Sequence, residues 1–111
     1  MEARLFALQR LSAIVMAPLV LFHLVMIFYA VRGGLTAAEI VARMQAGWWM
    51  PALYGLFAVA AAVHAPIGLR RILREWTVLP AHVVDPAMVA LGLLLLALGL
   101  RAVAALVGAG A

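Results

Sequence analysis

Three long runs of apolar residues, separated by short polar segments, dominate the pattern of this chain. They lie at about residues 11–31, 48–69 and 86–107. Each is close to the roughly 20 residues that an α-helix needs to cross the hydrocarbon core of a bilayer. We therefore predict an all-α integral membrane protein, a three-helix bundle that forms a single transmembrane domain over residues 1–111.

The second and third spans have recognisable first turns. The second is entered through the aromatic pair Trp48 and Trp49, which is typical of a membrane interface, and Pro51 follows within its first turn. For the third span, the sequence predicts a helix that starts with Asp85 as its N-cap and Pro86 at its first position.

The two connections also have predicted structure. Thr36 and Glu39 have the spacing of a capping box, which predicts a short helix through Met44 lying at the membrane interface. In the second connection, residues 70–76 are predicted to continue the second helix beyond the bilayer.

The composition supports the membrane class. The chain is 69% hydrophobic and 11% charged, whereas soluble domains have roughly 45–50% apolar and about 25% charged residues. Disordered chains are poor in apolar residues, and the absence of cysteine excludes a disulfide scaffold.

All eight basic residues are arginines, and they flank the apolar spans rather than forming a basic face, so we predict no binding to nucleic acid. Five of them fall on the side of the N-terminus and three on the other. The first group is Arg4, Arg10, Arg70, Arg71 and Arg74, and the second is Arg32, Arg43 and Arg101. This bias predicts a cytoplasmic N-terminus in a multi-pass protein of the bacterial inner (cytoplasmic) membrane. Arg101 either reaches the far interface or, if the third span is long, is a buried cation.

No constellation of catalytic residues is visible, because none of the four carboxylates is central in a span. Three histidines remain, of which His23 and His64 fall inside spans, where ionisable groups are rare and usually functional. His82 is predicted to lie, solvated, in a loop.

His64 has the most informative surroundings. On a helix, the small residues Ala60, Ala61 and Gly68 share its face, together with Arg71. Such a face admits either a flat macrocycle or another helix. Two interpretations stay open: His64 is a haem axial ligand with Arg71 near an anionic propionate, or it hydrogen-bonds a neighbouring helix.

His23 and His64 are predicted to lie at different depths. His23 follows Arg10 by 13 residues, which is roughly 20 Å of helix, whereas His64 is only about 9 Å from Arg70. One chain therefore does not place both at one iron. We expect His23 to hydrogen-bond a partner helix, with a second haem as the alternative.

A second candidate site lies on the same side of the membrane. Arg10, Ser12 and Trp76 are all predicted at that interface, where arginine and indole N–H groups could donate to the carbonyl oxygens of a quinone. The alternative is an ordinary basic anchor beside an interfacial aromatic belt.

Two segments carry a resemblance to a known family. Leu8–Ile14 is similar to a short pre-helix run in which Arg is followed two residues later by Ser or Thr. His64–Trp76 shows His, three residues, Gly, an aliphatic residue, and an acidic–aromatic pair seven and eight residues after the Gly. Together they resemble the membrane-anchor (cytochrome b) subunits of succinate dehydrogenase and fumarate reductase. The resemblance covers about residues 8–76; the third span agrees only in hydropathy.

The resemblance implies roles for individual residues. His64 takes the position of the haem b axial ligand, and Arg10 that of an arginine lining the quinone pocket. Trp76 stands where the family often has a quinone-binding Tyr, Gln9 where some members have His, and Phe6 where some have a quinone-contacting Ser. In the family, one haem is commonly held between histidines of two anchor chains.

The resemblance thus implies a non-catalytic anchor subunit of a succinate:quinone oxidoreductase. It would hold the flavoprotein and iron–sulfur subunits at the cytoplasmic face, beside a second anchor chain in the lipid bilayer. Haem b is expected at His64, Gly68 and Arg71, and a quinone at Arg10, Ser12 and Trp76, with either succinate oxidation or fumarate reduction as the physiological direction. The alternatives are a haem-free anchor of the same family and a small non-redox bundle for assembly or transport.

Overall fold

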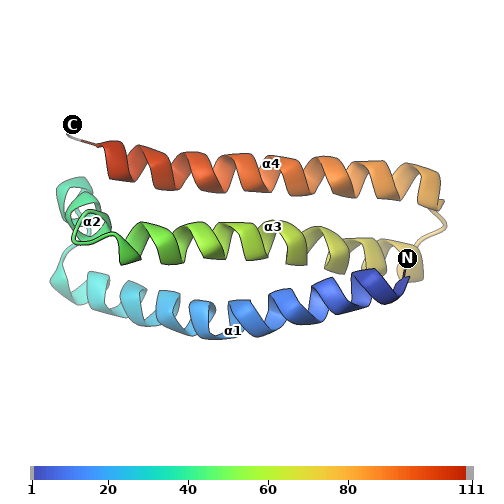
Figure 1. Ribbon diagram of the computed structural model, residues 1–111, viewed down its shortest axis with the longest axis horizontal. Helices are drawn as coiled ribbons and strands as arrows, with labels where there is room; N and C mark the ends of the chain where they lie inside the picture. The colour runs from blue at the N-terminus through green and yellow to red at the C-terminus, as the bar shows by residue number, and fades with distance from the viewer. Residues whose placement is uncertain (1, 110–111) are drawn as a thin grey trace.

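The computed structural model describes residues 2–109, which are helical over most of their length (Figure 1). Its elements are α1 (Glu2–Gly33), α2 (Ala37–Met44), α3 (Trp49–Trp76) and α4 (Ala81–Gly108). By length and composition, α1, α3 and α4 are each able to cross a membrane. No strand occurs between residues 2 and 109. The predicted all-α class with three spans is confirmed, and the orientation in the membrane stays a prediction.

The long helices lie side by side with α3 in the middle and antiparallel to both neighbours (Figure 1). Helix α3 packs against α1 on one side and against α4 on the other. The N-terminus and the α3–α4 connection lie together at one end, here called the N-terminal end. Helix α2 and the last turn of α4 lie at the opposite end, here called the α2 end.

Several predicted helix boundaries are confirmed. Helix α3 begins at Trp49 with Pro51 in its first turn, and it continues through residues 70–76. The predicted short helix exists as α2, and its position at the membrane interface stays a prediction. The Thr36 hydroxyl accepts a hydrogen bond from the Glu39 backbone N–H and donates one to the Glu39 carboxylate at 2.7 Å.

The predicted start of the third helix is wrong. Helix α4 begins five residues before Pro86, after the extended backbone of Pro80, which acts as its N-cap. The ring of Pro80 fixes its own φ and disfavours a helical residue before it, so the boundary falls there. Pro86 lies within the helix, and Asp85 forms an ion pair instead of a cap. His82 is therefore in the first turn of α4 rather than in a loop, although it is exposed as expected.

Helix α1 extends beyond the predicted span of residues 11–31. It begins at Glu2, so residues 8–10, which lie before that span, are helical as well. The segment holds no Gly and no Pro before Pro18, and Glu2 in the first turn interacts favourably with the positive end of the helix dipole.

Close packing of α3 and α4 depends on small residues. A Cβ atom added at Gly99 would lie 2.7 Å from the Cβ of Ala58, and one added at Gly92 would lie 3.2 Å from the Ala62 carbonyl oxygen. Large apolar side chains such as Phe28 and Leu93 instead point outwards. Outward apolar side chains and small contact residues are typical of helices that pack within lipid.

Different polar contacts join the helices at the two ends. At the N-terminal end, the Arg70 guanidinium contacts Asp85 of α4 at 2.7 Å and Glu2 of α1 at 3.2 Å. At the α2 end, the Gln45 side-chain amide donates to backbone carbonyls at the end of α4. These belong to Leu106, Val107 and Ala109, at 3.0, 3.0 and 2.7 Å.

Candidate functional site

His64 lies on α3 at the interface with α1, towards the N-terminal end. Its Nδ1 atom is 3.2 Å from the hydroxyl oxygen of Ser12, which comes from α1. The same hydroxyl donates to the Gln9 carbonyl at 2.9 Å. Ser12 is only 6% exposed, so its side of the contact is buried, while His64 is partly buried. For His64 Nε2, the described chain contains no hydrogen-bond partner.

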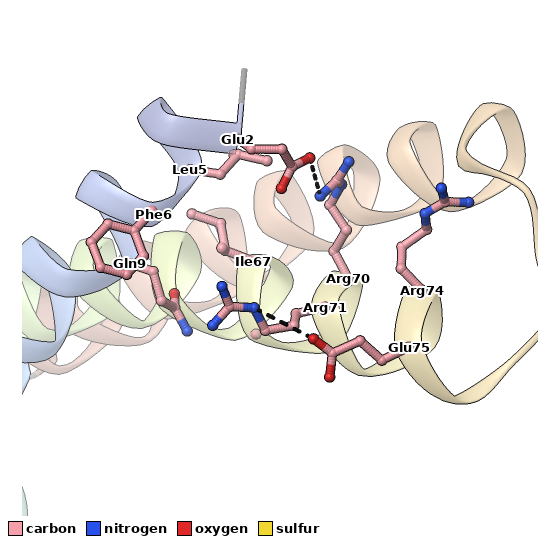
Figure 2. A pocket seen from close by; sticks show the side chains of 10 residues that line it. Glu2, Leu5, Phe6, Gln9, Ile67, Arg70, Arg71, Arg74 and Glu75 are labelled. Atoms are coloured by element: carbon pink, nitrogen blue, oxygen red, sulfur yellow. Dashed lines mark ion pairs between the residues drawn. The ribbon is translucent and has the colours of Figure 1, made fainter.

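A pocket of about 340 Å³ opens beside this contact, between the start of α1 and the end of α3 (Figure 2). Its lining comes from both helices and mixes apolar and charged side chains: Glu2, Leu5, Phe6, Gln9, Ile67, Gly68, Arg70, Arg71, Arg74 and Glu75. Helix α1 therefore contributes one wall, and the C-terminal turns of α3 contribute the other.

Gln9 and Arg71 are the polar groups that extend toward one another across this pocket (Figure 2). The Gln9 Oε1 atom is buried and has no hydrogen-bond partner within residues 2–109. Arg71 is more than half exposed, and its 3.9 Å contact with Glu75 is too long and too solvated to hold it firmly. The Arg71 guanidinium is thus free to contact a polar ligand.

Gly68 determines how closely Gln9 approaches α3. A Cβ atom at this position would lie 3.2 Å from the Gln9 amide nitrogen, closer than almost all real Cβ contacts. Without a side chain there, the Gln9 amide rests against the α3 backbone and forms the inner end of the pocket. Ala60, one turn before His64, is buried, so the small-residue face predicted around His64 exists.

Two of the predicted haem-site residues, Gly68 and Arg71, line the pocket, one and two turns beyond His64 on α3. His64 itself does not line it, and haem binding by these residues stays a prediction. The predicted quinone residues are not gathered in the same way. Ser12 is buried against His64, whereas Arg10 is exposed and Trp76 is 81% exposed, and neither lines the pocket. Their binding of a quinone stays a prediction.

Two polar residues at this end were not predicted as part of the site. Gln9 was noted only as a departure from the family pattern, although it lies three residues before Ser12 and so on the same helix face. Arg70 was counted only toward orientation, although it contacts two other helices. Extending the first helix back to residue 2 would have placed Glu2 and Gln9 on one face.

His23 has quite different surroundings. Its ring meets those of Tyr54 and Phe57 edge-on, with centroids 5.9 and 5.6 Å apart, and its Nδ1 atom is buried without a hydrogen-bond partner in the described chain. It lines a mostly apolar groove of about 570 Å³ toward the α2 end. The expected hydrogen bond to another helix is not made within residues 2–109.

The two histidines lie far apart along the bundle. His23 follows Ser12, the α1 contact of His64, by 11 residues, which is about 16 Å along a helix. This spacing agrees with the expected difference in depth and keeps them from sharing one iron.

The residues around His64 fit one side of a haem. Haem iron requires only axial ligands from protein, and a histidine is the commonest. One ring nitrogen of His64 is held by Ser12 and the other has no partner in the described chain, while the neighbouring residues are small and Arg71 is nearby. Across residues 2–109, no group of three or more His, Asp or Glu side chains could form a metal site by itself.

Comparison with known proteins gives one match. The model of a family described as succinate dehydrogenase/fumarate reductase transmembrane subunit matches residues 1–106. No curated protein and no solved structure matches the chain.

Proposed function

Because this chain belongs to the family of succinate dehydrogenase/fumarate reductase transmembrane subunits, we propose that it anchors the flavoprotein and iron–sulfur subunits of such an enzyme, binds haem b through His64 and helps form a quinone site. Three long apolar helices support its function as a multi-pass membrane anchor. The arginine bias supports a cytoplasmic N-terminal end, where the soluble subunits would dock.

The observation that carries the haem proposal is the Ser12–His64 contact beside a small-residue face. An imidazole held at Nδ1 presents Nε2 in a fixed direction, as metal-ligating histidines do when a neighbour orients the ring. Gly68 and the buried Ala60 give α3 a face without bulky side chains there, and the Gln9 amide of α1 lies against it at Gly68. Arg71, two turns from His64, is exposed enough to meet an anionic propionate. When bound, the haem supplies one-electron transfer.

The second axial ligand is proposed to come from a second anchor chain. His23 is about 16 Å away along α1, and His82 is exposed in the first turn of α4. Many apolar side chains of the spans point outwards and offer area for helices of such a chain. A haem between two chains would join them through one ligand from each.

The quinone is proposed to bind at the N-terminal end, in the pocket between Gln9 and Arg71. The amide N–H of Gln9 and the guanidinium of Arg71 can donate to the quinone oxygens, on which negative charge develops during reduction. Arg10 and Trp76 are exposed at the same end, where the iron–sulfur subunit would cover them and complete the site. Succinate oxidation supplies two electrons, and the quinone takes up two protons as it becomes a quinol; fumarate reduction is the reverse.

The test is a reduced-minus-oxidised optical spectrum of the purified complex for wild type, His64→Ala and a matched His82→Ala control. We expect a b-type band in wild type and in the control, and at least tenfold less in His64→Ala, with flavin content unchanged. A band that survives in His64→Ala would refute the ligand assignment. A wild-type complex with flavin and no band would identify a haem-free anchor.

The quinone site is tested in the same preparations with Gln9→Leu. We expect succinate-dependent quinone reduction to fall about tenfold, a typical loss for one hydrogen bond to developing charge, while succinate oxidation by a soluble dye stays at the wild-type rate. Equal losses of both activities would point to failed assembly and contradict a role of Gln9 at the quinone.

A further inference from the structure

We propose that Ser12 is a positioning residue for the haem ligand: its hydroxyl holds His64 in the tautomer that carries the proton on Nδ1, and so leaves the Nε2 lone pair for iron. This inference rests on the proposed haem ligation by His64. It also gives Ser12 a function other than the quinone contact that the sequence suggested.

The hydrogen bonds of Ser12 indicate that the imidazole proton of His64 is on Nδ1. A serine hydroxyl has one proton to donate and two lone pairs with which to accept. The Gln9 carbonyl can only accept, and the Ser12 hydroxyl donates to it at 2.9 Å. The contact at 3.2 Å between Ser12 and His64 Nδ1 is then made by the N–H of the imidazole, with the serine oxygen as acceptor.

The same contact excludes the other ring nitrogen as ligand. An iron atom at Nδ1 would have to occupy the position of the Ser12 hydroxyl, which is packed into the α1–α3 interface. In a neutral imidazole only one nitrogen carries a proton, so a donating Nδ1 leaves Nε2 as the basic atom. Ser12 thus determines which nitrogen is available for iron.

Ser12 supplies the hydroxyl of this contact. It is the only serine of the chain, and among residues 2–109 it is the only polar residue that is buried. Removal of the hydroxyl would take away the acceptor of the Nδ1 N–H when iron is bound at Nε2. Loss of such an outer partner typically weakens metal binding 10- to 100-fold.

The electronic effect has a defined sign. An acceptor on the Nδ1 N–H increases the electron density of the imidazole, and a more basic ligand favours the oxidised iron. Loss of the hydroxyl should therefore raise the reduction potential of the haem. A neutral hydroxyl is a weak acceptor, so we expect a severalfold change in the preference for oxidised iron, below the 59 mV that a tenfold change represents for a one-electron couple.

The test compares Ser12→Ala and Ser12→Thr in the assembled complex with Thr77→Val. The control removes a hydroxyl that donates to the Leu73 carbonyl at the end of α3, outside the pocket lining. Three quantities are measured: flavin per complex, the rate of haem loss to an apo-globin acceptor, and the midpoint potential of the b-type band. We expect Ser12→Ala to lose haem at least tenfold faster and to have a raised potential, while Ser12→Thr and Thr77→Val stay close to wild type.

The outcomes separate the positioning role of Ser12 from haem ligation by His64. Wild-type haem loss and potential in Ser12→Ala would overturn the positioning role, and so would equal changes in Ser12→Thr and Ser12→Ala, because these would indicate packing alone. Neither outcome affects ligation by His64. A band that is absent from wild type, or that survives in His64→Ala, would overturn both proposals.

Discussion

The two ends of this bundle provide opposite surroundings for a partly buried histidine. At the N-terminal end, His64 meets a serine from the neighbouring helix, close to a pocket with charged walls. Toward the α2 end, His23 lies on the same α1–α3 interface, between aromatic rings, with a ring nitrogen that has no partner in the described chain. Both rings are partly buried, and both fall within predicted spans.

The difference shows that burial alone does not mark a histidine as functional. What distinguishes His64 is a second polar side chain supplied by another helix, which fixes the ring and leaves one nitrogen available. The ends also differ in how their helices are joined. Ion pairs of Arg70 connect three helices at one end, whereas close contacts of small residues and a single amide connect them toward the other.

The largest effect is expected from Arg70→Met, which keeps the apolar stem and removes the charge. Asp85 would lose its 2.7 Å partner, and the three helices would lose their common contact. Breaking a buried pair costs about 3–5 kcal/mol; because Asp85 is 41% exposed, we expect about 2 kcal/mol. The free energy of unfolding in mixed detergent micelles measures this loss.

Arg74→Met is the matched control for that substitution. Arg74 lies on the same helix, and its hydrogen bond is to the Leu79 carbonyl at 3.2 Å in an exposed loop. We expect it to change stability by less than about 0.5 kcal/mol. If both variants lose the same free energy, the N-terminal end does not depend on its ion pairs.

A smaller loss of unfolding free energy is expected from Gly99→Ala. At this position α3 and α4 meet through close packing and not through an ion pair. The new methyl group would lie 2.7 Å from the Ala58 Cβ, so α4 must move away from α3. Such overpacking typically costs about 1–3 kcal/mol, from which the better helix propensity of alanine recovers up to about 1 kcal/mol. At Gly55 a new methyl group would meet nothing within 4 Å, so Gly55→Ala should show only the stabilisation that comes from the helix propensity of alanine. Comparable unfolding free energies for the two variants would show that this contact is loose.

The smallest effect, of opposite sign, is expected from His23→Leu. Leucine fills the space between Tyr54 and Phe57 and removes a buried nitrogen that has no partner in the described chain. We expect the chain to gain about 1 kcal/mol, since an unsatisfied buried polar group costs about 1–3 kcal/mol and some aromatic contact is lost. Unfolding of the purified complex in detergent gives the value. Loss of stability, or of a bound chromophore, would mean that His23 also binds a ligand, and the contrast between the ends would disappear.

Hydropathy predicted the three spans because lipid imposes a length and a composition on every helix that crosses it. The capping box at Thr36 predicted α2 for a similar local reason. The start of α4 was missed because two local signals compete, and the one at Pro80 lies earlier in the chain than the Asp85–Pro86 pair.

The site was predicted only in part, because sequence spacing gives faces within one helix and not contacts between helices. His64, Gly68 and Arg71 share a face of α3, and two of them, Gly68 and Arg71, line the pocket; haem binding by this group stays a prediction. Ser12 was singled out, but its contact with His64 joins positions 52 residues apart, and nothing local specifies that pairing. The same holds for Asp85, whose contact with Arg70 depends on where α4 begins.

The central place of α3 also sets the order in which the site is completed during synthesis. Ser12 enters the membrane with α1, and His64 can contact Ser12 only after α3 has been synthesised. The ligand contact then exists before Asp85 of the last helix arrives, since α4 supplies no atom to it. A nascent chain would thus pass through a stage in which the contact between Ser12 and His64 is formed while the side of α3 that packs against α4 is still open.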